Sequence, residues 1–176
     1  MRRRHGADRY KENIDYLFFW EHTIKTGEQV GKFIFNQWYL SPFIVDGVAY
    51  STAEHWMMAG KARLFKDIET LEKISNANTP REAKDLGRQV KGFDAAAWVR
   101  ICFAIVKDGN YHKFTQNKGY KEYLLATGNK VIVEASPVDT IWGIGFRQDS
   151  VQAKNLHHWR GQNLLGFALM EVRDML

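Results

Sequence analysis

The sequence has a single cysteine, Cys102, among its 176 residues, so no disulfide framework can hold its fold. We interpret Cys102, in the apolar stretch 98–106, as a buried small hydrophobe rather than a catalytic thiol. Long hydrophobic runs are also lacking, because the longest, such as Tyr16–Trp20, fall far short of the roughly 18 apolar residues of a membrane span. No apolar leader follows the basic start at residues 1–6. We therefore expect a cytoplasmic protein with no membrane contact.

Metal-ligand patterns are absent as well. The six histidines form no His-Glu-x-x-His motif, and a single cysteine supplies no thiolate cluster. The sequence thus predicts neither a metal site nor another cofactor.

Positive charge is concentrated at one end of the chain. Residues 1–11 carry five cationic side chains and one anionic one, which accounts for +4 of the formal net charge of +5. The remainder of the chain is close to neutral, which disfavours a broad basic groove for nucleic acid. We interpret residues 1–13 as a basic, flexible tail and residues 14–176 as one domain, because no repeat or Pro/Gly/Ser linker divides them.

Hydrophobic patterns and turn signals predict more helix than strand. Strands or strand-like pieces are expected at 14–20, 31–38, 43–50 and 130–134, and a turn at 26–31. Helices are expected at 51–65, 67–76, from 79 onwards, at 94–116, 120–126 and 161–175. Ser51 with Glu54 matches a capping box, although Thr52 is an alternative cap. These elements predict an α+β fold: a single compact, mainly helical domain with a few short strands.

Glu54 and Lys61 place a carboxylate and an amine on one face of the helix expected at 51–65. They lie seven residues apart, about two helical turns, on a face otherwise rich in apolar residues. The pair suggests acid–base or nucleophilic chemistry. The alternative is that Glu54 is only a capping acid and Lys61 only a solvated surface lysine.

A second candidate segment follows the strand expected at 130–134. Asp139 and Trp142 lie in a loop at the carboxyl end of that strand, a common place for site residues. Gly143 and Gly145 permit close approach of a ligand to the backbone. The alternatives are a turn built by Asp139, a tight glycine turn, and a core role for Trp142. Further along, the segment ending at Asn163 leads into the last helix, whose free N–H groups suit an anion.

Several motifs resemble one known family. They include Ser41-Pro-Phe43, Glu54-His55 with Lys61-Ala62, Ala83-Lys84 with Leu86-Gly87-Arg88, Val133-Glu-Ala-Ser-Pro-x-Asp-x-Ile-Trp-Gly-Ile-Gly145, and Gly161-x-Asn-Leu-Leu-Gly166. Over residues 31–176 the sequence resembles the NADAR, or YbiA-like, N-glycosidases.

The resemblance implies a YbiA-like fold and a glycohydrolase that acts on N-ribosides without a cofactor. It implies two substrate types: ADP-ribosylated guanine, free or in DNA or RNA, and ribosylaminopyrimidine phosphates of riboflavin biosynthesis. The expected catalytic residues are Lys61, Glu54 and Asp139. The expected substrate-binding residues are Asn36, Gln37, Trp38, His55, Arg88, Ser136, Trp142, Gly143, Gly145 and Asn163.

Two mechanisms fit these residue types. In one, Asp139 or Glu54 steadies a cationic C1 of the ribose and orients water. In the other, which we favour, Lys61 attacks C1 and forms a Schiff base that water resolves. Trp38 or Trp142 would stack on the base, and Arg88 or Arg147 would meet phosphate.

Two other classes compete with an enzyme. A non-catalytic module that binds ADP-ribose or another NAD derivative would use the same pocket without a nucleophile, but the presence of both Glu54 and Lys61 argues against it. A nucleic-acid-binding protein is suggested by the high isoelectric point, but its source is the tail. The sequence leaves the oligomeric state open.

Overall fold

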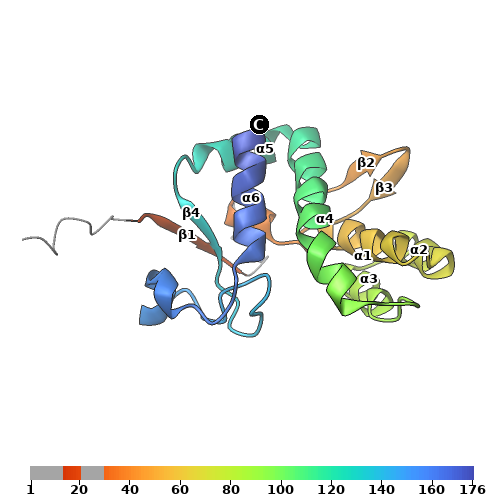
Figure 1. The fold of residues 1–176 in the computed structure, drawn as a ribbon. Coiled ribbons are helices and arrows are strands. Elements are labelled where there is room, and N and C mark those ends of the chain that lie inside the picture. Colours follow the sequence, from red (N-terminus) through yellow and green to blue (C-terminus); the bar gives the residue numbers. More distant parts are fainter. Residues whose placement is uncertain (1–13, 21–29) are drawn as a thin grey trace, which may run out of the picture.

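The computed structural model describes residues 14–20 and 30–176 (Figure 1). In chain order the elements are β1 (Tyr16–Phe19), the 3-10 helix η1 (Lys32–Phe35), β2 (Phe43–Val45), β3 (Val48–Tyr50), α1 (Ala53–Leu64), α2 (Ile68–Ser75), α3 (Pro80–Gly87), α4 (Ala95–Gln116), α5 (Lys118–Ala126), β4 (Val131–Glu134), η2 (Val151–Lys154), η3 (Leu156–His158) and α6 (Leu164–Met175). The α+β class with a mainly helical body, expected from the sequence, is confirmed.

The strands form two separate pairs. β1 and β4 pair in parallel, with Phe19 opposite Glu134, although more than a hundred residues separate them in the chain. β2 and β3 form an antiparallel hairpin whose turn residues, Asp46 and Gly47, both have positive φ. That conformation suits a two-residue hairpin and explains the Asp-Gly pair.

Helices α6 and α4 lie between the β1–β4 pair and helices α1, α2 and α3 (Figure 1). α6 and α4 lie side by side, with β4 packed against α6 and α1 packed against α4 (Figure 1). α2 and α3 pack against α1 and each other. The main core lies between these layers and includes Phe35, Phe114 and Leu169, all fully buried. Burial of this apolar surface is the main force that fixes the helices on the sheet.

Side-chain caps define most of the helix starts. Asp67, Thr79 and Asp94 each accept a hydrogen bond from the backbone N–H three residues later. α1 is capped by the alternative residue, Thr52, whose Oγ1 accepts from the N–H of His55. Ser51 is therefore not the cap. The Glu54 side chain lies in the wall of the cavity described below.

Two of the differences from the sequence expectation have a clear physical reason. The strand expected at 31–38 is wrong, because residues 32–35 form η1 instead. Three successive side chains, Phe33, Ile34 and Phe35, are buried there, and a strand would turn alternate side chains away from the core. The last helix begins at Leu164 rather than 161, because Asn163 adopts a left-handed conformation with φ 54°.

Some expectations cannot be compared with the structure. The basic tail at 1–13 and most of the turn expected at 26–31 lie outside the described residues. Among residues 14–20 and 30–176, no helix combines the length and apolar character that crossing a bilayer requires.

Candidate functional site

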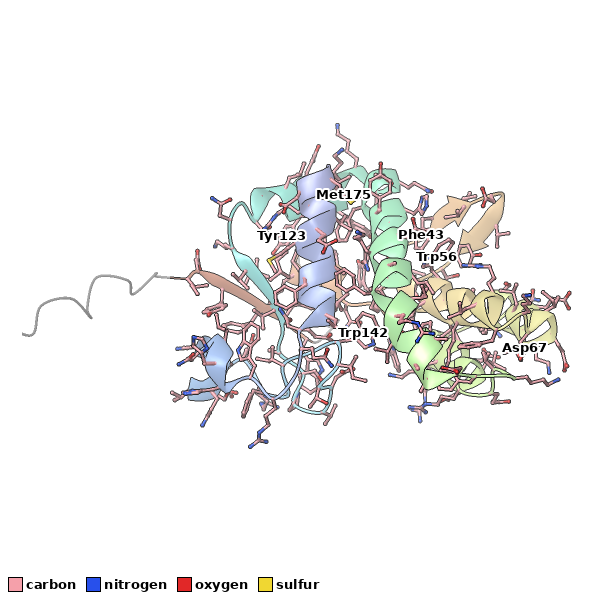
Figure 2. All side chains as sticks on the ribbon, in the orientation of Figure 1. Phe43, Trp56, Asp67, Tyr123, Trp142 and Met175 are labelled. Atoms are coloured by element: carbon pink, nitrogen blue, oxygen red, sulfur yellow. The ribbon has the colours of Figure 1, made fainter. Side chains whose placement is uncertain are left out.

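A cavity of about 460 Å³ lies between helices α1 and α3 on one side and β4, the loop after it and α6 on the other. Its walls come from the segment before α1, the first turns of α1, helix α3, the end of β4, the loop that follows β4, and the start of α6. Figure 2 shows Trp142 near the N-terminal end of α6. The lining residues are Trp20, Asn36, Gln37, Trp38, Glu54, Met57, Met58, Lys84, Glu134, Ser136, Val138, Asp139, Trp142 and Leu165. The cavity thus combines three tryptophans, three carboxyls and one amine.

One wall is a tight turn around Asn36. The Asn36 amide donates to the carbonyl of Trp20 at 2.6 Å, and its Oδ1 accepts from the N–H of Trp38 at 2.7 Å. The next carbonyl, that of Gln37, accepts from the N–H of Glu54 at 3.0 Å. These bonds hold the segment against the start of α1 and fix the backbone that carries Trp38. The three residues expected here, Asn36, Gln37 and Trp38, all line the cavity.

Glu54 is buried in the cavity wall, with 5% of its surface exposed. Burial raises the pKa of its carboxyl to about 7, and the nearby Asp139 adds to the rise. Lys84 and a hydrogen bond from the Trp38 side chain act in the opposite direction. A carboxyl with a pKa near neutral can both take up and release a proton at physiological pH.

Asp139 lines the cavity and also builds its own turn. Its Oδ1 accepts from the backbone N–H groups of Ile141 and Trp142, both at 2.8 Å, and its N–H donates to Ser136 Oγ at 3.1 Å. Both bonds to the carboxylate use the same oxygen. Asp139 therefore forms the turn that the sequence offered as an alternative. Asp139 and Ser136 also line the cavity, as expected.

Lys61 lies outside this cavity. Its Nζ donates to the carbonyl of Gly87 at 2.8 Å and lies 4.2 Å from the centre of the Phe93 ring. Burial lowers its pKa, and the nearby Arg88 lowers it further. It shares a helix face with Glu54 as expected, but two turns place it about 10 Å further along the axis.

The amine in the cavity is Lys84, on α3. Its Nζ lies 5.6 Å from the centre of the Trp38 ring, and its charge acts on both Glu54 and Glu134. The sequence reasoning missed Lys84 and Glu134 as site residues. Both stand inside the quoted motifs, Ala83-Lys84 and Val133-Glu-Ala-Ser-Pro, which was the available signal.

Glu134 is the last residue of β4 and directs its carboxyl into the cavity. Its Oε2 is shielded from solvent and has no hydrogen-bond partner among the described residues. Burial raises its pKa to about 8, and the negative charges of Asp139 and Glu54 contribute to the rise.

The other expected binding residues have structural contacts away from the cavity lining. His55 is buried, with Nδ1 2.7 Å from Thr52 Oγ1 and Nε2 3.1 Å from the carbonyl of Ala77. Arg88 is exposed and pairs with Asp85 at 3.0 Å. The fully buried Asn163 bonds to β4 through both ends of its amide.

Gly143 and Gly145 both lie close to neighbouring protein atoms. A Cβ on Gly143 would press on the carbonyl of Glu134, and one on Gly145 would press on Arg160. Gly145 also has φ 71°, a conformation that favours glycine. Within the described part of the chain, no three His, Cys, Asp or Glu side chains gather in a way that could hold a metal ion.

The geometry defines a class of site: an aromatic-walled cleft with an amine and three carboxyls, two of which, Glu54 and Glu134, have a raised pKa, suited to acid–base and nucleophilic chemistry. The NADAR domain model matches residues 18–176 of the chain. The chain therefore belongs to the NADAR family, as the motifs indicated.

Similar proteins carry consistent names. An N-glycosidase of Acanthamoeba polyphaga mimivirus is 44% identical over 170 residues, which cover 93% of this chain and 97% of that protein. N-glycosidase YbiA of Escherichia coli is 30% identical over 152 residues, covering 86% and 84%. The NMR structure of E. coli YbiA superposes with a TM-score of 0.72 at 26% identity, covering 92% of this chain and 84% of that one. The predictions of a YbiA-like fold and of a glycosidase that acts on N-glycosyl bonds are confirmed at the level of the family.

Proposed function

We propose that this chain hydrolyses the bond between a ribose and a nitrogen heterocycle, with Lys84 as the nucleophile. The observation that carries the proposal is the meeting of the Lys84 amine with Glu54, Glu134 and Asp139 in one tryptophan-walled cavity. Two substrate types fit this chemistry: ADP-ribosylated guanine, free or within DNA or RNA, and ribosylaminopyrimidine phosphates. Both present a flat heterocycle, a ribose and at least one phosphate. The proposed location of the enzyme is the cytoplasm.

The tryptophans supply the surface for the heterocycle. Trp38 and Trp142 stand on different walls of the cavity, one before α1 and the other after β4. Stacking on such rings holds a base with little dependence on its exact substituents. The exposed Arg88, near enough for its charge to act on Glu54, is the proposed partner of a phosphate at the cavity mouth.

The reaction begins with a proton transfer inside the cavity. A lysine attacks only as the neutral amine, so Lys84 first gives up a proton, which passes through water to the Glu54 carboxylate of the same cavity. The amine then bonds to C1 of the ribose, and the bond from C1 to the heterocycle breaks with its electron pair on the departing nitrogen. Ring opening gives a Schiff base between C1 and Nζ. Water adds to that carbon and releases the sugar and the free lysine.

Asp139 is proposed to orient the ribose. One of its carboxylate oxygens is used by the turn, and the other is available to a sugar hydroxyl on the cavity side. Its negative charge also favours the positive charge that develops at C1 as the bond to the heterocycle breaks.

A matched pair of lysine variants tests the proposal. Lys84→Met and Lys61→Met each remove one amine with similar loss of length, but only Lys84 lines the cavity. Purified variants are incubated with ADP-ribosylated guanosine and with a ribosylaminopyrimidine phosphate, and released base is measured by chromatography. We expect Lys84→Met to lose at least about 10³-fold in rate and Lys61→Met to stay within about threefold of the wild type.

Borohydride added during turnover should trap a sugar adduct on Lys84, located by peptide mass spectrometry. An adduct on Lys61 instead would restore the nucleophile expected from the sequence. Turnover without any adduct would indicate direct attack by water. Tight binding of both compounds with no turnover would indicate a binding module instead of an enzyme.

A further inference from the structure

Glu134 holds an oxygen that the protein leaves without a partner. Its Oε2 is buried and accepts or donates no hydrogen bond among the described residues, although the side chain lines the cavity. A buried polar atom without a partner destabilises a fold. Such an atom at a cavity wall points to a role toward a ligand.

The backbone of Glu134 is fixed from three directions. Its N–H donates to Asn163 Oδ1 at 3.0 Å, and its carbonyl accepts from the N–H of Ile144 at 3.0 Å. On the remaining side it pairs in register with Phe19 of β1. The backbone that carries this carboxyl is therefore held on a rigid support.

Asn163 contributes most to this anchoring. Its amide nitrogen donates to the carbonyl of Ile132 at 3.0 Å, and its amide oxygen accepts from the N–H of Glu134. The Asn163 side chain thus makes the hydrogen bonds that the backbone of a neighbouring strand would make to β4. Gly166 allows the approach, because a Cβ there would overlap the carbonyl of Ile132 and the Asn163 side chain. Asn163 is thus a positioning residue for Glu134.

The neighbouring charges act on the proton of Glu134. Burial and the negative charges of Asp139 and Glu54 raise its pKa to about 8, while Lys84 opposes the rise. These groups face it from the loop after β4, from α1 and from α3. Near neutral pH the carboxyl therefore carries a proton that it can donate.

The two other carboxyls of the cavity are engaged elsewhere. Glu54 accepts a hydrogen bond from the Trp38 side chain and is the proposed acceptor of the Lys84 proton. Asp139 holds its turn through Oδ1. Glu134 is the carboxyl whose buried oxygen has no such engagement.

We propose that Glu134 is the acid that protonates the departing heterocycle, a role that rests on the N-riboside hydrolysis proposed above. As the bond from C1 to nitrogen breaks, its electron pair stays on the nitrogen, which takes the proton from the Glu134 carboxyl. The carboxylate left behind is reprotonated from water before the next turnover. The substrate class follows: heterocycles, linked through a ring or exocyclic nitrogen, that are too basic as anions to leave unaided.

Glu134→Gln tests this role, because it keeps the size of the side chain and removes the transferable proton. On the riboside that the wild type cleaves best, we expect kcat to fall about 10²-fold or more with KM within threefold. The wild-type rate should fall as pH rises through about 8, where Glu134 loses its proton, and the variant should lack this alkaline limb. Glu171→Gln, at an exposed residue of α6 paired with Lys107, is the control and should match the wild type.

A leaving-group series separates acid catalysis from a structural effect. The loss caused by Glu134→Gln should shrink when the same riboside carries a less basic heterocycle, because such a group needs less help from a proton. An equal loss across the series would overturn the proposal. Wild-type rates in Glu134→Gln would overturn it and leave the Lys84 chemistry standing, whereas loss of activity in Glu134→Gln but not in Lys84→Met would overturn the nucleophile and keep the acid.

A measurement without substrate checks the proton itself. In protein with ¹³C-labelled glutamate carboxyls, the resonance absent from Glu134→Gln is that of Glu134. Its titration midpoint should lie near 8. A midpoint below about 5, close to that of an ordinary glutamate, would overturn the proposal.

Discussion

Replacing Lys113 with methionine should change the stability of the fold in opposite directions at neutral and at alkaline pH. Lys113, on α4, is completely buried, and its Nζ donates to the carbonyl of Asn36 at 3.1 Å. The ion pairs among the described residues do not include it. Burial without an opposite charge within ion-pair distance lowers the pKa of Lys113 from 10.5 to about 7.

The size of the effect follows from the two pKa values. Between pH 7 and 10.5 the unfolded chain holds a proton that the folded chain has released, so the wild type gains stability as pH rises. Each pH unit in this range contributes about 1.4 kcal/mol, and the whole range about 5 kcal/mol. Below pH 7 both states hold the proton and the gain is absent.

Methionine fills a similar volume and does not titrate, but it leaves the Asn36 carbonyl without its donor. That loss destabilises the fold by about 1–3 kcal/mol at every pH. The variant should therefore be more stable than the wild type by roughly 2–3 kcal/mol near pH 7, and less stable by roughly 1 kcal/mol near pH 10.

Urea unfolding followed by tryptophan fluorescence at pH 7, 8, 9 and 10 measures the difference between the two proteins. Lys118→Met, at a solvent-exposed lysine of α5, is the matched control and should track the wild type at all four values. A difference between Lys113→Met and the wild type that keeps the same sign and size across this range would refute the reasoning.

Substitutions at three further positions have defined outcomes. Asp139→Ala removes the acceptor of two backbone N–H groups and should lower the free energy of unfolding by about 1–2 kcal/mol in urea, whereas Asp139→Asn should keep the turn and lose about 10²-fold in turnover; unchanged turnover in the Asn variant would leave only the turn role. Gly166→Ala should lower the urea midpoint by the equivalent of about 1–3 kcal/mol, because its Cβ would push α6 away from β4, and a wild-type midpoint would contradict that contact. Glu54→Gln should stabilise the fold above pH 7, where the wild type must hold a buried charge, while lowering activity; equal melting temperatures at pH 8 would contradict the raised pKa of Glu54.

The sequence predicted most of the local structure, because the signals that set it lie within a few residues of one another. Asp67 and Asp94 cap helices that begin at the next residue, and Asp46-Gly47 makes the hairpin turn. The motif from Val133 to Gly145 indicated the family and placed Asp139 and Trp142 in the cavity. The error at 31–38 arose because an apolar run of that length suits a strand and a buried 3-10 helix equally well.

The tertiary structure decided which amine and which carboxyls line the same cavity. Glu54 and Lys61 share a helix face, which the spacing alone established. The cavity is closed by α3 and β4, however, so the amine that lines it together with Glu54 is Lys84, and a further carboxyl is that of the half-buried Glu134. Apart from its place in the Val133-Glu-Ala-Ser-Pro motif, no local pattern distinguishes the half-buried acid at the end of β4 from an ordinary strand residue. Its burial, its neighbours and its raised pKa depend on β1, α1, α3 and α6, which reach it from distant parts of the chain.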